Sequence, residues 1–200
     1  MRHSWIFGAA LTLAACTQES ATPAAESQHA AALVLSCDML DLDRAALSAR
    51  FGAENFTDQI LDGPEGEQYT ATILFPNDPA RRAEIQWADE ARASVAFFSV
   101  SGETSDWTGP HGVRLGASLA EIEQANGKPF NLYGFGWDYG GWSTHWNDGA
   151  FAGPDCLTRM RFQARGEGAQ GDSEFSSESA EMRAADAYVR EFLIRAAAAE

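Results

Sequence analysis

The side chains best suited to binding chemistry gather between residues 133 and 147. Aromatic and polar residues alternate on both sides of Gly140-Gly141, a pair suited to a tight β-hairpin turn because both positions accept positive φ. If Tyr139 pairs with Trp142, one face of the hairpin carries the aromatic side chains Tyr133, Phe135, Trp137, Tyr139, Trp142 and Trp146. The other face then carries polar residues beside glycines, namely Asp138, Ser143, His145 and Asn147.

The aromatic face of this hairpin has two interpretations. It can pack beneath a helix as core while the polar face is solvated, as is common in antiparallel sheets. Alternatively, it presents Trp and Tyr side chains to a partner, as anchors in a protein interface or as platforms for sugar rings. Under both interpretations the candidate binding residues lie on the hairpin: Trp137, Asp138, Tyr139, Trp142, His145 and Trp146.

No residue pattern in the sequence predicts an enzyme. The glycines from Gly134 to Gly140 miss the spacing of a dinucleotide-binding loop. Ser143 and His145 share a strand face, but no third residue completes a catalytic triad. The histidines are isolated, and no cysteine has the spacing of a metal site. We therefore predict no catalytic residues, no bound metal and no cofactor.

Residues 1–15 have the layout of a secretory signal peptide, with Arg2 ahead of an apolar run that is too short to span a membrane. The run ends in Leu13-Ala14-Ala15-Cys16, which closely resembles the lipobox of bacterial lipoproteins. That resemblance implies cleavage before Cys16 and a diacylglyceryl group on its thiol, which anchors the chain to a membrane. The alternative is an ordinary cleaved signal followed by an incidental cysteine.

The lipobox resemblance also implies a location. Thr17, rather than Asp, follows the cysteine, which in Gram-negative bacteria implies sorting to the outer membrane, facing the periplasm. Residues 16–35 are small, polar and Pro-containing, and we expect a flexible tether there. The chain is therefore predicted to be a lipid-anchored protein of the bacterial cell envelope.

Export leaves Cys37 and Cys156 as an even pair in an oxidising compartment, where a disulfide is the favoured prediction. Two separately buried thiols are the alternative. Closing so long a loop contributes about 4–5 kcal/mol to stability if the bridge is unstrained.

The composition of the 200-residue chain excludes some classes of protein. It has 29 acidic and 14 basic residues, a formal net charge of -15, and 45% apolar residues. That apolar content is sufficient for a core, so the chain is not a disordered acidic tail. Its scattered basic residues argue against nucleic-acid binding, and its charge favours a basic partner or a metal ion.

Two segments share the pattern of a short amphipathic helix, a glycine and an aromatic residue. In the first, over residues 42–51, Asp41 or Asp43 is expected to cap the helix; in the second, Ser118 and Glu121 form a capping box. Extended runs follow each helix, and we expect strands over residues 68–75, 82–88, 94–100, 131–139, 142–147 and 156–164.

These patterns predict an α+β fold made of two tandem helix-on-antiparallel-sheet repeats plus a C-terminal helix. The repeats span residues 36–103 and 104–165, and a Gly/Ser/Glu-rich linker spans residues 166–177. Residues 178–200 are predicted to form an amphipathic helix, because Met182, Ala185, Val189, Phe192 and Ala196 follow helical spacing.

This layout resembles the tandem repeats of β-lactamase inhibitor protein and the small lipoproteins of the outer-membrane barrel assembly machinery. The segment Asn126-Gly127-Lys128-Pro129-Phe130 and residues 134–141 also resemble motifs of uncharacterised bacterial exported proteins. We expect a non-enzymatic envelope lipoprotein that binds another protein, as an assembly factor or an enzyme inhibitor. The alternatives are a glycan- or peptidoglycan-binding module and an enzyme of unrecognised type.

Overall fold

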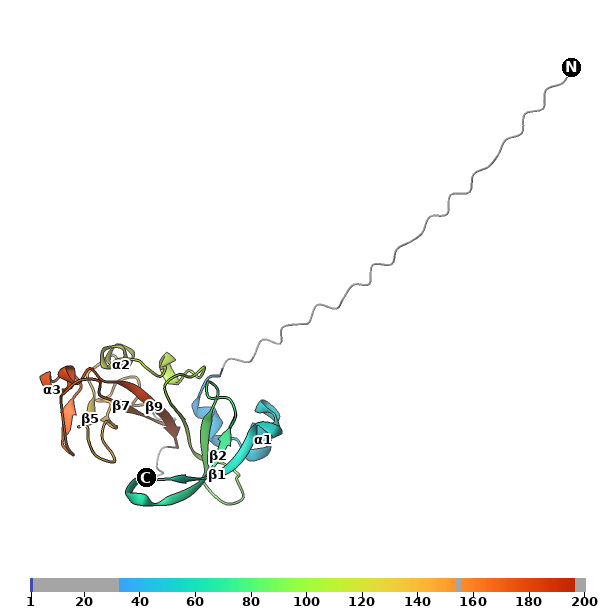
Figure 1. The fold of residues 1–200 in the computed structure, drawn as a ribbon, viewed down its shortest axis with the longest axis horizontal. Coiled ribbons are helices and arrows are strands. Elements are labelled where there is room, and N and C mark those ends of the chain that lie inside the picture. The colour runs from blue at the N-terminus through green and yellow to red at the C-terminus, as the bar shows by residue number, and fades with distance from the viewer. Residues whose placement is uncertain (2–32, 154–155, 197–200) are drawn as a thin grey trace. The chain divides into compact units, whose positions relative to one another are not determined.

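The computed structural model describes residue 1, residues 33–153 and residues 156–196. The predicted signal peptide, Cys16 and most of the predicted tether lie outside the described residues. Residues 33–196 form a mixed α+β unit with two antiparallel sheets (Figure 1). The described α-helices are α1 (Arg44–Phe51), α2 (Leu119–Asn126) and α3 (Ala180–Ala184). Short 3₁₀ helices are η1 (Cys37–Asp41), η2 (Ala53–Asn55), η3 (Pro64–Gly66) and η4 (Pro110–Gly112).

The starts of α1 and α2 are set by their caps. The Asp43 carboxylate accepts the backbone N–H of Ala46 at 2.7 Å, which satisfies one donor of the first turn of α1. At α2, the Ser118 hydroxyl accepts the Glu121 N–H, and the Glu121 carboxylate accepts the Ser118 N–H at 2.7 Å. The predicted capping box is therefore confirmed.

The larger sheet has the strand order β1-β2-β3-β4-β9-β7, and all its neighbouring strands are antiparallel. Its strands are β1 (Phe56–Asp62), β2 (Gln68–Leu74), β3 (Ala83–Trp87), β4 (Val95–Ser101), β9 (Tyr188–Arg195) and β7 (Leu157–Gln163). The sheet combines strands from both predicted repeats, and a tandem-repeat layout is not confirmed.

A smaller sheet has the order β6-β5-β8, formed by Ser143–His145, Asn131–Tyr133 and Glu174–Ser176. It connects to the larger sheet through an antiparallel bridge between Trp142 and Arg161 of β7. The prediction of a linker over residues 166–177 is wrong at its C-terminal end, because Glu174–Ser176 is strand β8, which pairs with β5.

The core lies on one face of the larger sheet. Its strands contribute side chains that are completely buried, among them Ile85, Phe98, Phe192 and Ile194. Leu47 from α1 and Ile122 from α2 join the same hydrophobic cluster, so both helices pack against this face. Because side chains alternate along a strand, the residues between these core positions point to the opposite face.

The disulfide between Cys37 and Cys156 is present, which confirms the predicted pairing. It joins η1 to the residue before β7, across a sequence separation of 119 residues. The bridge therefore links the start of the folded unit to an edge strand of the larger sheet.

The predicted C-terminal helix over residues 178–200 is wrong. Helix α3 ends at Ala184, and Tyr188–Arg195 is strand β9, which lies between β4 and β7. The pairing with β7 shifts register between Arg161 and Phe162, which leaves Arg190 as an extra residue on β9. This β-bulge places Val189 and Phe192 on the same buried face with helix-like spacing, although the segment is extended.

Candidate functional site

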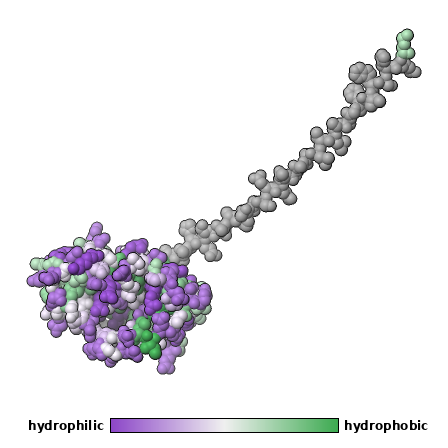
Figure 2. Space-filling model, viewed as in Figure 1, coloured by the Kyte–Doolittle hydropathy of each residue, from purple (hydrophilic) through white to green (hydrophobic). Residues whose placement is uncertain are grey.

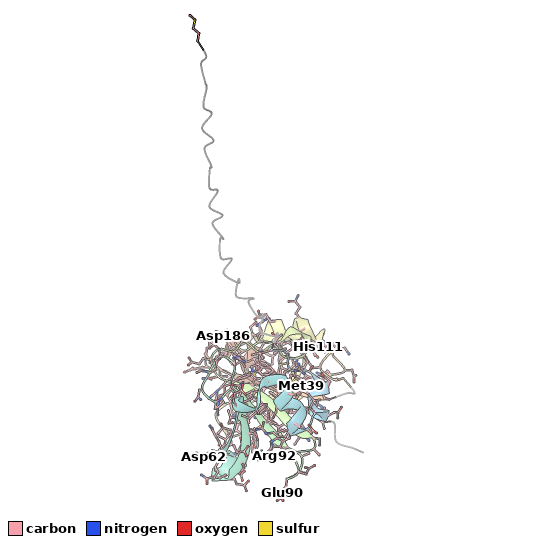
Figure 3. All side chains as sticks on the ribbon, turned by 90° about the vertical axis from the view of Figure 1, so that its right-hand side faces the viewer. Met39, Asp62, Glu90, Arg92, His111 and Asp186 are labelled. Atoms are coloured by element: carbon pink, nitrogen blue, oxygen red, sulfur yellow. A yellow bond between two sulfur atoms is a disulfide. The ribbon has the colours of Figure 1, made fainter. Side chains whose placement is uncertain are left out.

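A groove of about 870 Å³ lies against the face of the larger sheet opposite the core. Its floor comes from β2, β3, β4, β9 and β7, which present Tyr69, Glu84, Phe97, Ser101, Glu191, Leu193, Arg159 and Arg161. One wall is the β1–β2 turn, and the other is formed by the end of β5 and the loop that follows it. In Figure 3, Asp62 of the first wall lies at the opposite end of the view from His111 and Asp186.

Strand alternation explains why these side chains face the groove. On β4, Phe98 and Val100 are completely buried in the core, whereas Phe97 and Ser101 line the groove. On β9, Phe192 is completely buried, and the residues on either side of it line the groove. The central strands of the sheet therefore supply both the core and the floor of the groove.

Two carboxyl groups lie on the groove floor, on strands on either side of β4. Glu84 of β3 pairs with Ser99 of β4, and Glu191 of β9 pairs with Ser101. The Tyr69 hydroxyl donates a hydrogen bond to Glu84 Oε1 at 3.0 Å. Burial and the nearby Glu84 carboxylate raise the pKa of this tyrosine.

The surroundings of both carboxyl groups favour their neutral forms. Burial raises the pKa of Glu84. Burial, followed by repulsion from Glu84, raises the pKa of Glu191 to about 7, and the opposing effects of Arg161, Arg190 and a hydrogen bond from Ser99 are smaller. In the part of the chain that the structure describes, neither carboxylate forms an ion pair.

The arginines of β7 bond to backbone carbonyls of the wall. Arg161 pairs with Glu191 across the strands, but its guanidinium donates to the carbonyl oxygens of Asp138 at 2.8 Å and Gly140 at 3.1 Å. Arg159 donates to the Ser143 carbonyl at 3.2 and 3.0 Å. These bonds fix the wall of the groove to its floor.

Aromatic side chains make up most of this wall. Trp137 packs in T-shaped geometry with Tyr133 and Tyr139, with ring centroids 5.4 Å apart in each pair. The ring of Trp142 lies 5.3 Å from the Arg159 guanidinium and 5.9 Å from that of Arg161. The wall is therefore a set of aromatic rings that other side chains hold in place.

The predicted hairpin register, with Tyr139 opposite Trp142, is wrong. Instead Asn131 pairs with His145, and the Tyr133 N–H donates to the Trp142 carbonyl at 3.0 Å, which leaves residues 134–141 as a loop. Gly141 has a φ of 78°, and a Cβ there would collide with the carbonyl oxygen of Phe162. Close approach to β7, rather than a tight turn, accounts for this glycine.

The loop separates the predicted binding residues. Trp137, Asp138, Tyr139 and Trp142 line the groove together. Trp146 lies in the core, where its indole N–H donates to the Thr158 carbonyl at 2.7 Å, and Phe135 is also buried.

The predicted polar face of the hairpin is not formed. His145 is exposed on β6 and is not among the groove-lining residues, whereas Ser143 is buried.

Sequence reasoning missed the groove floor. Glu84 lies in a predicted strand, and its position between the buried residues Ala83 and Ile85 was a signal that it faces away from the core. Glu191 and Leu193 could be placed only with β9 assigned as a strand, and the helical interpretation of this segment concealed them.

The groove continues into a second hollow of about 610 Å³ that shares Phe97, Trp142, Arg159 and Leu193 with it. Arg159 lines both hollows and Arg195 lines the extension, so basic groups lie at this end of the groove. Seen from the side shown in Figure 2, the surface of the described residues is mostly hydrophilic. Charged, aromatic and aliphatic side chains together line the groove and its extension.

Within the described residues, no group of three or more His, Cys, Asp or Glu side chains is arranged to hold a metal ion. Among the same residues, no helix has the length and apolar character needed to cross a membrane. A scan against protein-family models and searches of curated proteins and of solved structures found no match.

Proposed function

We propose that this chain is a membrane-tethered envelope lipoprotein that binds a segment of another protein in its groove and catalyses no reaction. The observation that carries the proposal is the groove itself, in which an open sheet face meets a wall of Tyr and Trp rings. Aromatic and Arg side chains are enriched where proteins bind one another. The lipobox around Cys16 supports the tether.

The groove wall supports this proposal because it is held in place before a partner arrives. The Arg161 bonds to the carbonyls of Asp138 and Gly140 hold the loop against β7. A wall that is already ordered loses little conformational entropy when it binds.

The tandem-repeat interpretation fits the same proposal. Within the bounds of the predicted repeats, α1 precedes β1 to β4, and α2 precedes β5, β6 and β7. The resemblance to β-lactamase inhibitor protein supports the same class of protein-binding function.

A glycan-binding function is the second candidate, because Trp137 and Tyr139 lie beside Asp138 in the groove. Sugar stacking needs a free ring face, however, and the T-shaped contacts of Trp137 and the guanidinium groups near Trp142 reduce the available faces. If tryptophan fluorescence responds to peptidoglycan fragments in the wild type but not in Trp142→Ala, the glycan function replaces the protein-binding one.

An affinity pull-down with the lipidated protein tests the protein-binding proposal. The groove variant is Trp137→Ala/Tyr139→Ala, and His145→Ala is the matched control because it is exposed outside the groove. Circular dichroism first establishes that both variants fold.

We expect the wild type and His145→Ala to capture the same defined protein from the native envelope. With that protein purified, we expect affinity for the groove variant to fall by about tenfold or more. Equal affinity for the folded groove variant and the wild type contradicts the proposal.

A further inference from the structure

Glu84 and Glu191 are two carboxyl groups of the groove floor whose surroundings raise their pKa values. Both line the groove from strands next to β4, and neither forms an ion pair within the described part of the chain. The Tyr69 hydroxyl satisfies one oxygen of Glu84 at 3.0 Å, but it brings no charge. Partial burial of a carboxylate without a counter-ion raises the free energy of the folded protein, and a cation that binds from outside offsets much of that increase.

Two of the arginines whose charges act on this carboxyl pair, Arg161 and Arg82, bond to other groups. Arg161 lies opposite Glu191 in the strand pairing, but it donates to the wall carbonyls of Asp138 and Gly140. Arg82, whose charge acts on Glu84, donates to the Gln59 side chain at 3.4 Å. The pair therefore remains available to a cation that enters the groove.

Apolar side chains beside the carboxyl pair are suited to a long cationic side chain. Phe97 of β4 and Leu193 of β9 line the groove floor, and Tyr139 lines the wall. Lys and Arg bury their methylene stems against apolar surface while the charged head meets a polar partner. Aromatic rings add a cation–π attraction to that head group.

Resting on the function proposed above, we propose that Glu84 and Glu191 form a receptor for a lysine or arginine side chain of the bound protein segment. The cationic head pairs with the two carboxylates, and its stem lies on Phe97 and Leu193. The charge of the whole chain, -15, favours the approach of such a basic segment.

This receptor depends on pH because its carboxylates must be ionised. The charged and titratable groups that share the groove with Glu191 are Tyr69 from β2, Glu84 from β3, Arg159 and Arg161 from β7, and the wall residues Asp62, Tyr133, Asp138 and Tyr139; the charge of its neighbour Arg190 also acts on it. Together, burial and Glu84 raise the pKa of Glu191 to about 7. Cation binding is therefore strong above neutral pH and weakens as the pH falls below 7.

An NMR titration of the full mature chain tests this receptor, with the Glu side-chain carboxyl carbons labelled. The probe is N-acetyl-arginine amide, and its neutral isostere N-acetyl-citrulline amide is the control ligand. Glu191→Gln removes the charge at nearly constant volume. Glu90→Gln is the matched control variant, because Glu90 is exposed outside the groove and lies at the periphery in Figure 3.

At pH 8 we expect the arginine probe to shift the Glu84 and Glu191 resonances saturably, and the citrulline probe to leave them unchanged. Affinity for the arginine probe falls by about tenfold at pH 5.5 and by a similar factor in Glu191→Gln, whereas Glu90→Gln binds as the wild type does. Equal shifts from citrulline, equal affinity for Glu191→Gln, or the same shifts from calcium chloride overturn the receptor.

The receptor and the proposed function fail separately. If the pull-down depends on Trp137 and Tyr139 but the arginine probe does not bind, the groove binds a protein without this charge pairing. If the probe binds but the folded groove variant captures the partner as well as the wild type does, the cation site stands and the protein-binding function of the groove is wrong.

Discussion

At the scale of single residues, the carboxyl group of Glu191 links the groove to the pH dependence of stability. Burial and the adjacent Glu84 raise its pKa from the ordinary value of 4.5 to about 7. Between those two pH values the folded state binds more protons than the unfolded state, so this group lowers stability as the pH rises through that window. The same residue that we assign to cation binding therefore costs stability when the groove is empty.

Replacing Glu191 by Gln removes that cost. We expect Glu191→Gln to raise the free energy of unfolding by roughly 1–3 kcal/mol at pH 8, and by much less at pH 4.5, where the folded state is protonated and the unfolded state is half protonated. Urea denaturation at the two pH values measures this difference. Glu90→Gln, on the exposed surface, is the control, and an equal gain for Glu191→Gln at both pH values would show that the carboxyl is not destabilised in the fold.

At the scale of elements, the accuracy of sequence prediction depended on whether the signals were local. Helix α2 and strands β2, β3 and β4 were predictable, since a capping box and Pro- or Gly-containing turns mark their ends. Strand β9 was not, because the β-bulge at Arg190 gives its buried residues a helix-like spacing. The loop over residues 134–141 also escaped prediction, because it hydrogen-bonds to β7 and to residues 169–173, which are distant from it in the sequence.

Two glycines with almost the same φ test the importance of this loop's approach to β7. Gly141 has a φ of 78° and Gly112 a φ of 79°, but only at Gly141 does a Cβ meet a backbone oxygen, that of Phe162. We expect Gly141→Ala to cost about 1–3 kcal/mol more than Gly112→Ala. Thermal or urea unfolding of both variants measures the difference. Equal costs would mean that only the positive φ matters and that the loop does not press against β7.

At the scale of the whole molecule, long-range pairing creates the groove. Its floor needs β9 to pair with both β4 and β7, and these contacts join segments far apart in the chain. The sequence predicted the aromatic wall residues Trp137, Tyr139 and Trp142, because they belong to a local cluster of aromatic residues on both sides of Gly140-Gly141. It could not place Glu84 and Glu191 on one surface, since that depends on strand order rather than on any local pattern.

The disulfide supports this long-range architecture. Removing it with Cys37→Ala/Cys156→Ala is expected to lower the free energy of unfolding by roughly 2–5 kcal/mol, because the unfolded chain regains the freedom of a long loop. Chemical denaturation of oxidised wild type and variant measures the loss. Unreduced wild-type protein in which both Cys37 and Cys156 react with a thiol reagent would contradict the bridge.

The most direct test of the central claim, that the groove binds a protein, is site-specific photo-crosslinking in the native envelope. A photoreactive p-benzoylphenylalanine replaces Tyr139 on the groove wall or, as the control, His145 on the exposed surface outside it. If the groove binds a protein, a discrete crosslinked species forms from position 139 and is absent from position 145. The same crosslinked species from both positions, or one from position 145 alone, would contradict this claim.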